Sequence, residues 1–278
     1  MPFKKAALWT LFWFLTAMSF AAGVFYFQGQ DKAMEFLAGY LIELSLSIDN
    51  LFLFLMLFTL YKIDPLYQRR VLNWGIVGAI IMRLIFIVLG IALVEKFHWV
   101  IYIFGIILII TGYKMAFGKE SEPNLENNWS IKLLKKFTPV SHEMHGEKFF
   151  VKLNGVLHAT PLFVVLLLIE STDLLFAIDS IPAIFAITRD PFIVYSSNVL
   201  AILGLRSLYF FLERVQRAFA YVKYGVALLL AVTGVKMLLT FWHIKVPVPF
   251  ALGIIATILI GSVVASVLFS RKKERSYE

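Results

Sequence analysis

The sequence predicts an all-α polytopic membrane protein, on the evidence of its composition, its long apolar runs and the uneven distribution of its basic residues. Sixty per cent of the 278 residues are hydrophobic and 16% are charged, and the mean hydropathy is +0.82. A soluble domain carries about 25% charged residues. This composition excludes an ordinary soluble domain, and we expect neither an enzyme nor a resident cofactor.

Apolar runs of about 20 residues, long enough to cross a bilayer, indicate about eight transmembrane helices. They cover roughly residues 6–27, 33–60, 71–94, 98–117, 160–188, 192–213, 217–242 and 248–270. Pro182 is expected to interrupt the fifth, because it cannot donate a hydrogen bond within a helix. The only long connection, 118–157, contains "WSIKLLKKF" (129–137), which suits either a helix on the membrane surface or a solvated linker.

The positions of Lys and Arg predict the orientation. If the N-terminus is cytoplasmic, 19 of the 26 basic residues fall on the cytoplasmic side and 5 on the other, leaving Arg83 and Arg206 within spans. Cytoplasmic loops carry such an excess, so we expect a multi-pass protein with both termini in the cytoplasm. The net charge of +8 fits attraction to anionic lipid headgroups and indicates no nucleic-acid partner. The absence of Cys excludes disulfides, thiolate ligands and thiol catalysis.

Three motifs occur twice in the same order, one in each successive span. They are "SIDN" (47–50) and "AIDS" (177–180), "MRLIF" (82–86) and "LRSLY" (205–209), and "TGYKM" (111–115) and "TGVKM" (233–237). Because each copy holds three spans, the second would enter the membrane from the opposite side. The sequence therefore predicts an inverted-topology repeat, which is typical of secondary transporters.

The repeat divides the chain into five predicted parts. They are an N-terminal transmembrane anchor (1–32), the first three-helix repeat (33–117), a cytoplasmic loop (118–157), the second repeat (158–242, its spans beginning at 160) and a last transmembrane helix with a basic tail (243–278).

Polar residues inside the spans form the candidate site. The predicted metal ligands are Glu43, Asp49, Asn50, Asp173, Asp179 and Ser180; Glu170, Ser47 and Thr172 are further candidates as ligands or in a proton relay. An acid inside a membrane costs several kcal/mol and by default marks a functional site. Arg83 and Arg206 are expected to serve as counter-ions or to tie helices together. The alternative is that the acids are structural and pair with these arginines.

Helical spacing constrains how these ligands meet. Glu43 shares a helix face with Ser47 and Asn50, whereas Asp49 points about 120° away from Glu43. The same spacing puts Glu170, Asp173 and Ser180 on one face. The set is all oxygen, which favours hard ions such as Mg²⁺, Ca²⁺ and Mn²⁺ without separating them.

The chain resembles the TerC family of integral membrane proteins, including its Alx-type members. The resemblance rests on "SLSIDN" (45–50), "ESTDLLFAIDSIPAIFAI" (170–187) and "NVLAILGLRSLYF" (198–210) and extends over roughly 33–242. This family is associated with tellurite-resistance gene clusters and with manganese export. The resemblance implies a metal-ion exporter of the bacterial inner membrane, with Mn²⁺ as the transported ion.

The expected function is therefore the export of a divalent cation in exchange for protons through an all-oxygen site near the membrane midplane. A non-transporting scaffold that aids metal delivery, or metal or tellurite stress resistance, is the alternative. The sequence indicates no particular protein partner.

Overall fold

The computed structural model describes residues 3–118, 129–141, 143–153, 155–215, 222–242, 244 and 246–274. Within these helices, side chains are described except at positions 49, 175, 176, 178, 179, 214, 215, 222 and 267–274.

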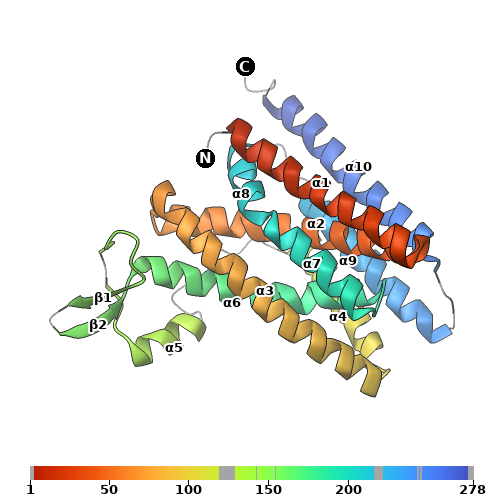
Figure 1. The fold of residues 1–278 in the computed structure, drawn as a ribbon, viewed down its shortest axis with the longest axis horizontal. Coiled ribbons are helices and arrows are strands. Elements are labelled where there is room, and N and C mark those ends of the chain that lie inside the picture. The colour runs from red at the N-terminus through yellow and green to blue at the C-terminus, as the bar shows by residue number, and fades with distance from the viewer. Residues whose placement is uncertain are drawn as a thin grey trace.

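Long helices make up most of the described chain (Figure 1). In order they are α1 (Phe3–Gln28), α2 (Gln30–Leu60), α3 (Pro65–Lys96), α4 (Val100–Phe117), α6 (Pro161–Phe185), α7 (Pro191–Leu203), α8 (Leu205–Val215), α9 (Val222–Leu239) and α10 (Val248–Glu274). The shorter elements are α5 (Trp129–Phe137), strands β1 (Phe150–Leu153) and β2 (Val156–Ala159), and the 3₁₀ helix η3 (Thr240–Trp242). The prediction of an all-α polytopic architecture is confirmed.

The predicted number of eight spans is not supported by the described part of the structure. Among the described residues, six helices are long and apolar enough to cross a membrane, and a bent α7–α8 pair raises the number to seven. Helix α6 is not among them; it carries Glu170, Asp173 and Asp179. Its 25 residues would extend about 37 Å, which exceeds a hydrocarbon core of about 30 Å.

Two details of the predicted spans differ from the structure. Helix α6 continues through Pro182 to Phe185, so the interruption expected there is not found. The predicted span 192–213 is instead divided at Gly204 into α7 and α8, which are bent by 42°. The bend directs α8 toward α1, against which it packs.

Proline and aspartate mark where several helices begin. Pro65, Pro161 and Pro191 occupy first-turn positions, where the missing N–H has no helical partner to lose. Asp64 accepts a hydrogen bond from Leu66 N at 2.7 Å. Such N-caps stabilise a helix by about 1 kcal/mol.

The helices pack in pairs around α2, the most enclosed of the candidate spans. Helix α2 contacts α7 and α6, α3 contacts α6, and α4 contacts α9. The α4–α9 contact is closest at glycines: a Cβ added at Gly112 would lie 2.6 Å from Ala227 O, and one at Gly234 would lie 2.5 Å from Gly105 O. Helix α1 packs at the periphery through small residues, including Ala6, Ala17 and Ala21, as is common where helices meet in membranes.

The region 118–157 contains helix α5, which agrees with the helical alternative for 129–137, and most of a β-hairpin, which the sequence did not predict. Strands β1 and β2 are antiparallel, with Phe150 opposite Ala159 and Leu153 opposite Val156, and Gly155 has a φ of +83° in the turn. An Asn-Gly pair between two short runs is a strong hairpin signal. Helix α5 packs on α6, where Ser130 Oγ donates to Ser171 Oγ at 3.3 Å. These elements lie together at one end of the molecule (Figure 1).

Candidate functional site

Arg83, on α3, is the centre of a buried polar cluster that joins four helices. Its side chain is 2% exposed, and Nη1 forms an ion pair with Glu43 Oε1 of α2. The same nitrogen donates to Asn198 Oδ1 of α7 at 2.8 Å, and Nη2 lies 3.5 Å from Asp173 Oδ1 of α6. We call Glu43, Asn50, Arg83, Asp173 and Asn198 the Arg83 cluster.

Side chains of α2 make two further hydrogen bonds to carboxylates of this cluster. Asn50 Nδ2 donates to Asp173 Oδ1 at 3.3 Å, and Ser47 Oγ donates to Glu43 Oε1 at 3.3 Å. Glu43, Ser47 and Asn50 are all buried, in keeping with the shared helix face that their spacing predicts. A carboxylate of α2 and a carboxylate of α6 therefore meet at one arginine in the interior.

Four buried oxygen atoms on α2 and α6 have no hydrogen-bond partner within the described structure, three of them in the Arg83 cluster. They are Glu43 Oε2, Asn50 Oδ1, Asp173 Oδ2 and Ser180 Oγ. Buried polar atoms are nearly always bonded, so an unpartnered one needs a specific explanation. Arg83 Nε also has no partner. The oxygens come from α2 and α6 and belong to the ligand type that hard cations prefer.

The described side chains do not by themselves form a complete metal site. Among them, no group of three or more His, Asp or Glu residues is arranged to hold a metal ion. Glu43 and Asp173 contribute two carboxylates. Asp49 and Asp179 lie within α2 and α6, but their side chains are outside the described part of the structure.

The remaining candidate residues lie around this centre. Glu170 is half-buried against α3, where a Cβ added at Gly78 would lie 2.1 Å from its Oε1. Thr172 Oγ1 donates to Leu168 O at 2.7 Å. Arg206 is exposed at the start of α8 and donates to Asn73 Oδ1 at 2.9 Å. It therefore ties α8 to α3 but pairs with no carboxylate among the described side chains.

Asn198 is the site residue that sequence reasoning missed. It is fully buried on α7, and its Nδ2 donates to Val194 O at 2.9 Å, which orients Oδ1 toward Arg83. The signal that could have identified it is a single amide in a largely apolar run. The motif alignment pairs Asn198 with Gly75, so it offered no second polar residue.

A second polar group connects the start of α2 to the segment between α6 and α7. Lys32 Nζ lies 2.9 Å from Glu35 Oε2 and 3.1 Å from Asp190 Oδ2. Thr188 Oγ1 donates to Glu35 Oε2 at 2.6 Å, and Asp190 N donates to Thr188 Oγ1 at 3.2 Å. We call Lys32, Glu35, Thr188 and Asp190 the Lys32 network.

The Lys32 network should lose stability in acid. Burial of Asp190 works to raise its pKa, but hydrogen bonds from Lys32 and from the backbone N–H groups of Ile193 and Phe192 outweigh it and lower the pKa. A lowered pKa adds stability above the unfolded value of about 3.9, and this contribution is lost as the pH falls through the folded value. The midpoint temperature of thermal unfolding in detergent should therefore fall more steeply between pH 7 and pH 3 in the wild type than in Asp190→Asn.

Asparagine suits this comparison because it also serves well as an N-cap, so the start of α7 is retained while the charge is removed. Equal pH dependence in the two proteins would contradict an ionised Asp190 in the network.

The fold and the site together define a multi-pass α-helical membrane protein with an ionic cluster buried between its helices. The chain matches the "Integral membrane protein TerC family" over residues 28–274, and it belongs to this family. No solved structure matches it.

Relatives similar to the chain cover nearly all of it. A protein of Photorhabdus laumondii subsp. laumondii named "Putative membrane-bound redox modulator Alx" is 43% identical over 98% of this chain and 88% of its own length. The protein of the same name from Escherichia coli (strain K12) is 44% identical over 94% of this chain and 83% of its own. The "Uncharacterized membrane protein STKORF319" of Myxococcus xanthus is 45% identical over 97% of this chain and 84% of its own length.

Proposed function

We propose that the protein is a secondary transporter that exports a divalent cation, Mn²⁺ foremost, in exchange for protons. The observation that carries this proposal is the set of four buried, unpartnered oxygens on α2 and α6. A divalent cation bound at the Arg83 cluster would give the free oxygens of Glu43, Asn50 and Asp173 a partner, which apolar packing cannot do. Oxygen ligands favour a hard cation, and the choice of Mn²⁺ follows the family resemblance.

Arg83 explains how the buried carboxylates can remain ionised when no metal ion is bound. Two buried carboxylates and one guanidinium leave the described cluster with a formal charge of −1. In this proposal Arg83 acts as a tethered cation that compensates Glu43 and Asp173 until a metal ion competes for them. Protonation of carboxylates on the return step would serve the same purpose, because each bound proton removes one buried negative charge.

The helix contacts support a two-fold related arrangement of the repeats. If α2 corresponds to α6, α3 to α7–α8 and α4 to α9, then the α2–α7 contact corresponds to α6–α3. The α2–α6 and α4–α9 contacts each relate a helix to its own counterpart. Such inverted repeats place substrate sites at their interface near the midplane. Asn50 meets Asp173 across α2 and α6, and the same symmetry would bring Ser180 toward Glu43.

The two ends of α2 differ in a way that suits uptake of a cation from one side. The Lys32 network closes one end. At the other end, about 42 Å away along the helix, lies a cavity of about 620 Å³ that includes Phe52, Gln68 and Glu213 in its lining. Phe52 of its lining follows Asn50 of the cluster by two residues along α2. We interpret this cavity as the entry path from the cytoplasm.

Proton exchange provides the driving force that export requires. Moving one charge against 100 mV costs about 2.3 kcal/mol, so an ion of charge +2 costs about twice that. Exchange for two protons carries no net charge and removes this electrical cost. The carboxylates of the site are the groups that would hold those protons.

The name of the Alx relatives refers to redox modulation. This chain contains no Cys, so it has no thiol with which to carry out disulfide exchange. Export of a metal ion would change the metal content of the cell and could alter its redox state indirectly. The transport proposal is therefore compatible with the name.

We place the protein in the bacterial inner membrane with both termini in the cytoplasm, on the distribution of Lys and Arg. The start of α1 and the end of α10 lie toward the same end of the molecule (Figure 1), which supports placing both termini on the same side of the membrane. Reporter fusions at positions 140 and 278 should report the cytoplasm, and those at 190 and 245 the outside. An outside signal at 140 would overturn the orientation and the direction of transport.

The transport proposal is tested with the purified chain in proteoliposomes containing a Mn²⁺-sensitive dye. A pH gradient should drive Mn²⁺ flux above that of protein-free vesicles, and a proton ionophore should collapse it. Competition by Ca²⁺ and Mg²⁺ measures ion preference. Flux at background while the gradient is intact would refute transport and favour the scaffold alternative.

A further inference from the structure

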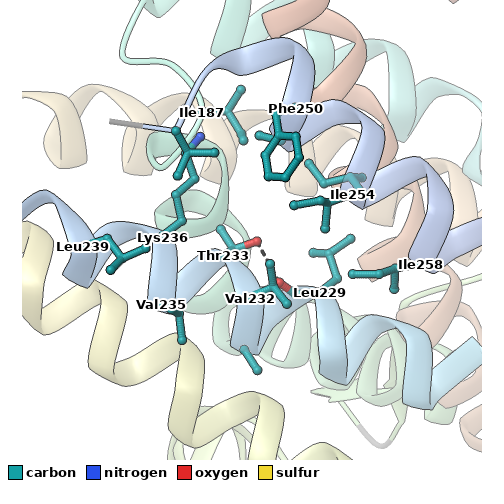
Figure 2. Close-up of a pocket in the computed structure, with 14 residues that line it drawn as sticks. Ile187, Leu229, Val232, Thr233, Val235, Lys236, Leu239, Phe250, Ile254 and Ile258 are labelled. Carbon is teal, nitrogen blue, oxygen red and sulfur yellow. Dashed lines mark hydrogen bonds between the residues drawn. The ribbon is translucent and has the colours of Figure 1, made fainter. Parts of the chain in front are cut away.

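A pocket between α9 and α10 lies outside the Arg83 cluster and combines an apolar lining with one cation. Its volume is about 340 Å³, within the range of roughly 300–1,000 Å³ that is common for small-molecule sites. The lining comes mainly from α9 and α10, with Ile187 from the segment after α6 (Figure 2). Apart from Thr233 and Lys236, the lining side chains are apolar.

Lys236 has no hydrogen-bond or ion-pair partner within the described structure, although its side chain is only partly exposed. Glu35 is near enough to act on its charge, but Oε2 of that carboxylate already accepts hydrogen bonds from Lys32 and Thr188. The hydroxyl of Thr233 donates to Leu229 O at 2.7 Å. An ammonium beside an apolar cavity is costly unless an anion accompanies it.

The repeat provides an internal comparison. Lys114 occupies the position in "TGYKM" that Lys236 occupies in "TGVKM". Lys114 is exposed near the end of α4, and it does not line this pocket. The pocket therefore distinguishes two lysines that the sequence motifs make equivalent.

We propose that this pocket binds one anionic phospholipid of the bilayer, with an acyl chain along the apolar lining and the headgroup phosphate on Lys236 Nζ. Charge complementarity selects the occupant: an acyl chain alone would leave the ammonium unpaired, and a free anion would leave the apolar lining unfilled. Exposed Val235 and Phe250 at the pocket lie where acyl chains would surround a transmembrane helix. Basic pockets between transmembrane helices are known to hold anionic headgroups. The proposal does not depend on the transport function.

Native mass spectrometry of the full-length protein tests this site, with an equimolar mixture of phosphatidylglycerol and phosphatidylcholine added in detergent. The wild type should retain one phosphatidylglycerol in preference to phosphatidylcholine. Lys236→Gln should bind phosphatidylglycerol about tenfold more weakly, as expected when one charged hydrogen bond is lost. Lys114→Gln is the matched control and should bind like the wild type.

Ile254→Trp gives a second, charge-neutral test, because it fills the pocket while Lys236 remains. It should reduce retention of phosphatidylglycerol to the same extent, and a monodisperse elution profile ensures that either variant is folded. The proposal is overturned if phosphatidylcholine is retained equally by the wild type, if Lys114→Gln loses as much binding as Lys236→Gln, or if Ile254→Trp binds like the wild type.

Discussion

Replacing Arg83 with Gln should destabilise the protein by about 3–5 kcal/mol, the cost of removing one partner from a buried ion pair. The guanidinium contacts Glu43, Asp173 and Asn198, and its side chain is 2% exposed. Its loss leaves two buried carboxylates without their counter-ion. The measurement is the unfolding midpoint of the purified variant in detergent, together with its abundance in membranes.

Arg206→Gln is the matched control, since Arg206 aligns with Arg83 in the paired sequence motifs but is exposed and bonded to Asn73. It should cost about 1 kcal/mol, as for a single hydrogen bond. Adding Glu43→Gln to Arg83→Gln should recover part of the lost stability, because it neutralises one stranded charge. An Arg83→Gln protein as stable as the wild type would contradict a buried ionic cluster.

The different positions of the two arginines illustrate what the sequence could not predict. The motif alignment pairs Arg83 with Arg206, and both lie in apolar segments. Arg83 lies inside α3, which is continuous, whereas Arg206 lies just after the bend at Gly204. The bend places Arg206 at the surface. Its position depends on how α8 packs against α1 and α3, which local sequence does not encode.

Local spacing succeeded where the side chains lie on one straight helix. The positions of Glu43, Ser47 and Asn50 predict a shared face, and all three are buried, with Ser47 bonded to Glu43. The apolar runs likewise predict most of the helices, because a membrane requires every backbone group to be bonded within its segment. Asn198 was missed because its role arises only where α7 meets α3.

Tertiary packing also explains why helix α6 continues through Pro182. A proline inside a helix removes one hydrogen bond and usually bends it, which made an interruption the natural expectation. Helix α6 nevertheless continues to Phe185, and Ile181, Ala183 and Ile184 around the proline are buried. Burial on several sides holds this turn in place, and such support comes from residues distant in the sequence.

Asp49→Asn and Asp179→Asn should each reduce Mn²⁺ efflux to background while the protein remains at normal abundance. The two residues align in the motifs "SIDN" and "AIDS" and lie within α2 and α6, the helices that supply the unpartnered oxygens. If both carboxylates bind the transported ion, the amide removes a negative charge that the ion requires. Neutralising an acid inside the membrane also removes a desolvation cost, so insertion should not suffer.

Efflux and abundance must be measured in the same cells, because the two roles predict different combinations. A structural acid paired with an arginine would leave a stranded charge when neutralised, and abundance would fall with efflux. Asp31→Asn, at the exposed start of α2, is the control and should retain both. Loss of efflux at normal abundance in both variants supports an ion-binding role, whereas normal efflux in both would refute it, since neither carboxylate could then be required by the transported cation.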